Sequence, residues 1–186
     1  MSGQWSGRKF IIAGHVYAGV RYKSTPLWHK VYAEQYFKIL RDYHHNIIIE
    51  VMGHDHYADV RYHSSNSVLN LKDSDVKFDY HNLIVAPGIT PIKGNNPGVG
   101  MFEISSDGVP SNLNFEFIDL VPTMGKSTVP YSDLKFLSLP MRDYGVTSIT
   151  ASAISDFRRE LANDKDLTLF YLTRKMGYDA FSDEET

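Results

Sequence analysis

Residues 47–56 read IIIEVMGHDH, an apolar run followed at once by glycine, histidine, aspartate and histidine. A short run rich in β-branched residues is typical of a buried strand, so residues 53–56 are expected in the loop at its exit. In a loop that begins with glycine, the imidazoles of His54 and His56 can converge on one locus. Imidazole is the commonest metal ligand among side chains, and open α/β sheets place their sites at strand carboxyl ends. The stretch therefore predicts a site at a sheet edge.

A second unit of the same kind lies nearer the start of the chain, where residues 10–15 read FIIAGH. It predicts a short strand over 10–13 that ends at a Gly-His pair. Together the two units predict that His15, His54 and His56 meet at one edge of a sheet. The alternative is that these are hydrogen-bonded loop histidines without a ligand, and a single Gly-His pair does not exclude it.

The number of metal ions that the site could hold depends on which carboxylates add to the histidines. Three imidazoles could hold one Zn²⁺ with an open fourth position, but divided between two ions they would leave each short of ligands. Asp55 lies between the two histidines and is expected to point away from them. Asp59 is better placed for an outer role, fixing the tautomer of a ligating histidine.

The segment 86–98, APGITPIKGNNPG, is dense in proline, glycine and asparagine. Such residues specify a set backbone path, because proline fixes φ and glycine and asparagine accept left-handed conformations. Two interpretations stay open: a plain turn between strands, or the wall of a site.

Further elements follow from periodicity and capping residues. Thr25 and Pro26 suit the N-cap and first position of a helix. Residues 54–79 are mostly polar and predict a loop or a loosely ordered insertion. Further strands are expected at 83–86, 101–104 and 112–120, and helices at 149–161 and after an N-cap at Asp164. The residues expected to form the buried stripe of the first helix are Trp28, Val31, Tyr32, Tyr36, Ile39, Leu40 and Tyr43.

The predicted fold class is mixed α/β (α+β). An α/β domain over residues 1–122 is followed by a helical C-terminal subdomain over 123–186.

Composition excludes several classes of function. The chain has 186 residues, a net charge of −3 and no basic stripe, so nucleic acid is not expected as a partner. It contains no apolar run of transmembrane length. Without cysteine it has neither disulfides nor thiolate ligands. With no secretory signal and no Asn-x-Ser/Thr sequon either, an intracellular location is slightly favoured.

The motifs in this order resemble the C-terminal half of the acid sphingomyelinase-like phosphodiesterases, in the calcineurin-like metallophosphoesterase superfamily. The resemblance covers nearly the whole chain. It also includes Arg142-Asp143-Tyr144-Gly145 and the two helices expected after it. The matching residues of the first domain are Gly14, His15, Gly19, Trp28, Gly53, His54, Asp55, His56, Asp59, Ala86, Pro87, Ile89, Thr90, Pro91, Asn96, Pro97 and Gly98.

The resemblance implies a fold, a metal set and a chemistry. The fold would be the second half of a metallophosphoesterase β-sandwich flanked by helices. In the complete family site two divalent ions, most often zinc, would activate water and stabilise charge on the phosphoryl oxygens during phosphoester hydrolysis. Whether this chain alone binds either ion or none stays open. His15 and His54 would ligate one ion and His56 the other, and the turn with Thr90 and Asn96 would form the wall. A sphingolipid headgroup, a nucleotide and a polyphosphate chain stay open as substrates.

The resemblance also implies missing parts. The family's N-terminal half carries further site residues in Asp-x-His, Gly-Asp and Gly-Asn-His motifs, and the residues before the strand at 10–13 contain none of them. One hypothesis is a fragment or split subunit of a phosphodiesterase, inactive alone, which needs the N-terminal half or a partner subunit over its open sheet edge. The other is a catalytically inactive structural or interaction subunit of a larger assembly.

Overall fold

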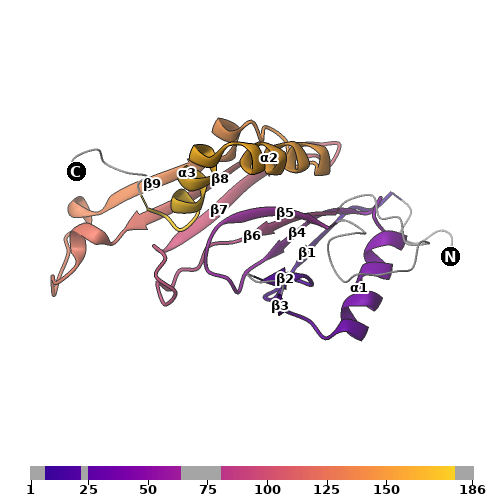
Figure 1. The fold of residues 1–186 in the computed structure, drawn as a ribbon, viewed down its shortest axis with the longest axis horizontal. Helices are drawn as coiled ribbons and strands as arrows, with labels where there is room; N and C mark the ends of the chain where they lie inside the picture. The colour runs from indigo at the N-terminus through magenta and orange to yellow at the C-terminus, as the bar shows by residue number, and fades with distance from the viewer. Residues whose placement is uncertain (1–6, 22–24, 64–80, 179–186) are drawn as a thin grey trace.

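A computed structural model, shown in Figure 1, describes residues 7–21, 25–63 and 81–178 of the chain. The described part has a mixed α/β fold, which confirms the predicted fold class. None of its helices has the length and apolar character needed to span a membrane. The helices and strands are β1 (Phe10–Ala13), β2 (Val20–Arg21), β3 (Thr25–Pro26), α1 (Lys30–Asp42), β4 (Ile47–Met52), β5 (Asp59–His63), β6 (His81–Val85), β7 (Gly98–Ile104), β8 (Pro110–Asp119), β9 (Lys135–Pro140), α2 (Ala151–Asn163) and α3 (Lys165–Arg174).

The larger sheet has the strand order β1-β4-β6-β5, in which β1, β4 and β6 run parallel and β5 runs antiparallel to β6. Met52, the last residue of β4, is paired with Val85, the last residue of β6, so these strands end at the same edge. The segments that follow β1 and β4 leave the sheet side by side, and Gly53 N donates to His15 O at 2.9 Å. The parallel pairing thus brings both Gly-His units to one edge.

The second sheet is antiparallel, with the order β7-β8-β9. The strand pair expected at 101–104 and 112–120 is confirmed by β7 and β8, although both strands begin earlier. Strand β9 pairs along β8, with Leu139 opposite Phe115. The part of the chain after residue 122 is therefore not entirely helical, and its separation as a subdomain stays a prediction.

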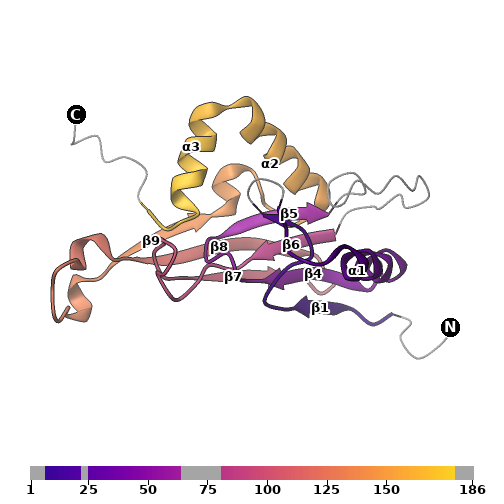
Figure 2. The same cartoon turned by 60° about the horizontal axis from the view of Figure 1, so that its bottom comes forward.

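One apolar core joins the two sheets to α2 and α3, while α1 packs on the other face of the larger sheet. Figure 2 shows α2 and α3 on one side of the strands and α1 near the end opposite β9. The buried residues of the shared core are Ile49, Ala58, Val60, Ile84, Leu113, Phe115, Phe117, Leu137, Leu139, Met141, Tyr144, Val146, Ile149, Ile154, Phe157 and Tyr171.

Helix α1 departs from the sequence prediction at its start. Thr25 and Pro26 form β3, which pairs with β2, and the helix begins only at Lys30 with His29 as its N-cap. Proline suits an extended edge segment as well as a helix start, because its fixed φ of about −65° is compatible with both. Pairing with β2 decides between the two.

The buried face of α1 was also predicted wrongly for most of its residues. The buried side chains are Ala33, Phe37 and Leu40, which recur at helical spacing. Ala33 packs with Ala18, Phe37 and Leu40, and its short side chain gave no sign of this buried position. The members of the expected stripe that are instead exposed are Val31, Tyr32, Ile39 and Tyr43.

Strand β5 lies within the segment 54–79 that was expected to be a loop. Residues 64–79 of that segment lie outside the described residues. The helix expected at 149–161 is α2, which begins at Ala151, and α3 follows its predicted N-cap, Asp164. The side chain of Asp164 accepts a hydrogen bond from Leu167 N at 2.9 Å and begins α3.

Candidate metal centre

His15 and His54 lie together where β1 and β4 end. His15 Nε2 is 3.4 Å from His54 Nδ1, and the two rings meet edge to face. Two nitrogens bound to one tetrahedral zinc ion at about 2.0–2.1 Å lie about 3.3 Å apart. The separation of the two imidazole nitrogens therefore fits a pair of ligands on one ion.

The loop that carries His54 and His56 has an unusual backbone. Both residues have positive φ, 77° for His54 and 67° for His56. A left-handed conformation costs a residue with a Cβ about 1–2 kcal/mol, so the surrounding contacts must hold the loop in this form. Such strain is often found where a side chain must be presented in one direction.

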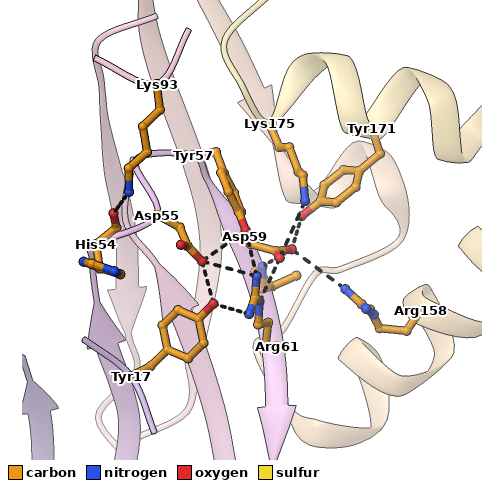
Figure 3. Close-up of polar contacts among 11 residues, drawn as sticks. Tyr17, His54, Asp55, Tyr57, Asp59, Arg61, Lys93, Arg158, Tyr171 and Lys175 are labelled. Carbon is orange, nitrogen blue, oxygen red and sulfur yellow. Dashed lines mark hydrogen bonds and ion pairs between the residues drawn. The ribbon is translucent and has the colours of Figure 1, made fainter. Parts of the chain in front are cut away.

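Asp55 supplies one of these contacts. Its side chain is buried and, in Figure 3, points away from His54 toward Tyr17 and Tyr57. Figure 3 shows the hydroxyls of Tyr17 and Tyr57 donating to Asp55 Oδ2 at 2.5 and 3.1 Å. Arg61 approaches the same oxygen at 3.8 Å. Burial, followed by the bond to Asp55, raises the pKa of Tyr17, which keeps its hydroxyl protonated as a donor.

His56 is held by the proline- and glycine-rich turn. Its Nδ1 lies 3.1 Å from the carbonyl oxygen of Thr90, and Gly88 N donates to the His56 carbonyl at 3.1 Å. When Nδ1 carries the proton and donates it to a carbonyl, Nε2 is left with the lone pair that a metal needs. Thr90 thus contacts the site through its backbone.

Lys93 extends from the same turn to the histidine loop. Its ammonium group donates a hydrogen bond to the carbonyl oxygen of His54 (Figure 3). Ile89 and Ile92, on either side of Thr90 in sequence, are 78% and 74% exposed. The turn therefore places one cation and two apolar side chains in the segment that contacts the histidines.

Asp59 lies in a buried ionic cluster. It accepts from Arg61 Nε at 2.9 Å and from the Tyr171 hydroxyl at 3.0 Å, and Lys175 Nζ lies 3.7 Å away. Arg158 Nη1, at 3.9 Å, completes the set shown in Figure 3. The expected bond from Asp59 to a histidine is not among these contacts of the described residues. Asp59 instead joins β5 to α2 and α3.

Asn96, expected in the wall of the site, is 2% exposed. Its side-chain amide donates to Gly177 O at 2.7 Å and its Oδ1 accepts from Leu120 N at 3.1 Å. It therefore fixes the end of the turn to the segment after α3.

Sequence reasoning did not identify Tyr17, Tyr57, Arg61 or Lys93 as parts of this region. Tyr57 and Arg61 lie within five residues of His56, so a concentration of polar and aromatic residues after the histidines was a usable signal. Tyr17 and Lys93 gave no such signal, because each meets the loop only through the fold.

The donor set in the described residues is incomplete. His15 and His54 are within ligand distance of each other, but no group of three or more histidine, cysteine, aspartate or glutamate side chains gathers there in a metal-binding arrangement. Comparison with protein-family models finds no matching family, and comparison with curated proteins finds no match.

Proposed function

We propose that this chain is part of a metal-dependent phosphoester hydrolase of the sphingomyelinase-like phosphodiesterase type and carries one half of its metal site. The observation that carries the proposal is the 3.4 Å separation of His15 Nε2 and His54 Nδ1, which suits two ligands on one zinc ion. The two strand-Gly-His units end at adjacent parallel strands, the usual place for a site in an open sheet.

The three histidines have separate roles in this proposal. His15 and His54 hold one ion, and His56, with its Nδ1 directed to the Thr90 carbonyl, offers Nε2 to a second. Divalent ions at such a site lower the pKa of water and stabilise charge on phosphoryl oxygens. Asp55, bound by Tyr17 and Tyr57, keeps the histidine loop in its strained form.

The proposal requires a partner. Three imidazoles are fewer donors than two ions need, so the remaining ligands must come from an N-terminal half or a separate subunit. Strand β1 is the edge of the larger sheet, and its residues Phe10 and Ile11 are 39% and 47% exposed. A strand at the edge of a sheet can accept another strand along its open side. The proposed partner covers this edge and supplies the missing metal ligands. The completed site binds a phosphoester substrate.

Zinc binding tests the proposal directly. Calorimetric titration of the chain with Zn²⁺ is expected to show binding that His54→Ala abolishes and His29→Ala leaves unchanged. His29 is a suitable control, because it is an exposed imidazole at the start of α1. Phosphodiester hydrolysis by the chain reconstituted with its partner should show the same dependence on His54. Activity that survives His54→Ala would refute the proposal.

A second candidate is a non-catalytic subunit that serves in assembly. The absence of a three-donor group from the described residues favours it, as does the exposed apolar surface of α1, with Val31, Tyr32 and Ile39 at least half exposed. This candidate predicts no stoichiometric metal in the assembled particle. Elemental analysis of the purified assembly distinguishes the two candidate functions, because two metal ions per chain would exclude the non-catalytic subunit.

A further inference from the structure

The segment that follows α3 contacts both loops of the candidate metal centre. Three successive carbonyl oxygens are involved. Lys175 O accepts from Ala58 N at 2.8 Å, just after the histidine loop. Met176 O and Gly177 O accept from the backbone and side-chain amides of Asn96, at 2.9 and 2.7 Å, at the end of the turn.

Side chains of the same region add to these bonds. The hydroxyl of Tyr178 donates to Gly94 O, within the turn, at 2.6 Å. On the histidine-loop side, Lys175 Nζ lies 3.7 Å from Asp59 Oδ2, as Figure 3 shows. We call residues 175–178 the C-terminal clip.

The clip fits closely against the sheet core. Gly177 has a φ of 81°, which favours glycine. A Cβ on Gly177 would lie 2.6 Å from Phe117 Cδ1 and 2.8 Å from Asn96 Cβ. Phe117 is buried in the core shared by both sheets, so it cannot move away at low cost. The clip therefore has little freedom to shift.

The loops are also joined directly near the histidines. His56 Nδ1 contacts Thr90 O, and Lys93 donates to His54 O. The clip binds the same two loops farther along, at Ala58 and Asn96. The histidines thus lie on segments fixed at two separated points, and the clip forms one of them.

We propose that the C-terminal clip positions the histidine loop and the turn relative to each other, and thereby sets the geometry of the metal ligands. The inference rests on the proposed function, because it concerns the metal site assigned there. Residues 175–178 act through Ala58 and Asn96 and are positioning residues. Residues that orient metal ligands usually change metal affinity by about 10–100-fold when they are altered.

The test compares the native chain with three variants, each of which carries one substitution. Gly177→Ala forces the clip away from Asn96 and Phe117, and Tyr178→Phe removes only the bond to Gly94. Ile154→Val is the control, because Ile154 lies on α2 and the substitution leaves a small gap in the shared core, away from the clip and the loops. Calorimetry measures Zn²⁺ affinity, and hydrogen exchange of the metal-free chain measures protection of the amides of residues 53–58 and 88–98.

Gly177→Ala is expected to weaken Zn²⁺ binding at least about tenfold and to speed exchange in both loops. Tyr178→Phe should weaken Zn²⁺ binding roughly threefold, because it removes one neutral hydrogen bond. If Gly177→Ala does not fold, Tyr178→Phe alone tests the inference. Ile154→Val should leave both readouts unchanged.

Two results overturn the inference in different ways. If the native chain binds Zn²⁺ through His54 but Tyr178→Phe and Gly177→Ala bind as tightly, the clip has no positioning role and the proposed function stands. If the native chain binds no Zn²⁺, or binds it without His54, the proposed function fails and the inference fails with it.

Discussion

The hydroxyl of Tyr171 donates a hydrogen bond to Asp59 Oδ1 at 3.0 Å, joining α3 to β5 across 112 residues of sequence. Both residues are buried, so water cannot replace this bond when it is lost. Hydrogen bonds to charged groups contribute about 1.5–3 kcal/mol, more than those between neutral groups. The pair therefore links the histidine-bearing part of the chain to its C-terminal helices.

Tyr171→Phe removes only this hydroxyl. It is expected to lower the free energy of unfolding by about 1.5–3 kcal/mol, measured by urea unfolding followed by circular dichroism. Tyr32→Phe is the matched control, because Tyr32 is 66% exposed and surface changes usually alter stability by less than about 0.5 kcal/mol. Equal stability of the two variants would show that the bond contributes nothing.

The ionic cluster predicts a dependence of stability on pH. Burial alone would raise the pKa of Asp59, but Lys175, Arg61 and Arg158 outweigh burial and lower the pKa below its ordinary value of 3.8. The folded state therefore retains the ionised form more strongly than the unfolded chain does. This stabilisation is present above the ordinary pKa and is lost as the pH falls through the lowered pKa.

Asp59→Asn separates this effect from the titration of other carboxyl groups. At neutral pH the variant should be less stable by about 3–5 kcal/mol, because the buried cations lose their partner. Below about pH 4 the difference in unfolding free energy between native and variant chains should shrink. Denaturant unfolding at a series of pH values measures it, and a difference that stays constant down to pH 2 would contradict the assignment.

The parts of the fold that sequence predicted depend on local signals. The strand before Gly53 and the start of α3 at Asp164 are set by residues within a few positions of each other. The apolar run and the capping side chain are sufficient there, because their stabilising contacts lie within the segment or require only a buried face.

The parts that could not be predicted depend on contacts between distant residues. Glu50 is buried in an otherwise apolar strand, bonded to the Tyr36 hydroxyl at 2.7 Å and 3.3 Å from His63 Nε2. The residues next to Glu50 in sequence do not predict these partners. The same holds for Asn96, whose position at the clip depends on Gly177, 81 residues later. Within the candidate site, the sequence indicated the histidines and Thr90, but not the tyrosines that hold Asp55 or the lysine that binds the His54 carbonyl.

The left-handed backbone of His54 predicts a difference between two substitutions that both remove the imidazole. At a φ of 77°, glycine avoids the Cβ strain that alanine retains. His54→Gly should therefore be more stable than His54→Ala by about 1 kcal/mol in thermal or urea unfolding, while neither binds Zn²⁺. The same pair at His63, within strand β5, should show the opposite order, because glycine weakens a strand. Identical stability of His54→Gly and His54→Ala would argue against a strained loop.

Gly88→Ala tests whether the turn orients His56. A Cβ on Gly88 would lie 2.7 Å from His56 Cγ, so the ring must leave its place beside the Thr90 carbonyl. The ring should then lose the tautomer with the proton on Nδ1, which nitrogen chemical shifts of the imidazole report. Zn²⁺ affinity should fall by about tenfold or more.

Gly100→Ala is the control for the steric effect of an added Cβ beside an aromatic ring. Gly100 lies on strand β7, which carries none of the three candidate ligand histidines, and a Cβ there would lie 3.0 Å from Cε1 of the buried Phe115. It is expected to lower stability while leaving the His56 tautomer and the Zn²⁺ affinity unchanged, because the ring keeps its bond to Thr90. If Gly88→Ala instead leaves the His56 resonances as they are in the native chain, the turn does not set the orientation of this ring.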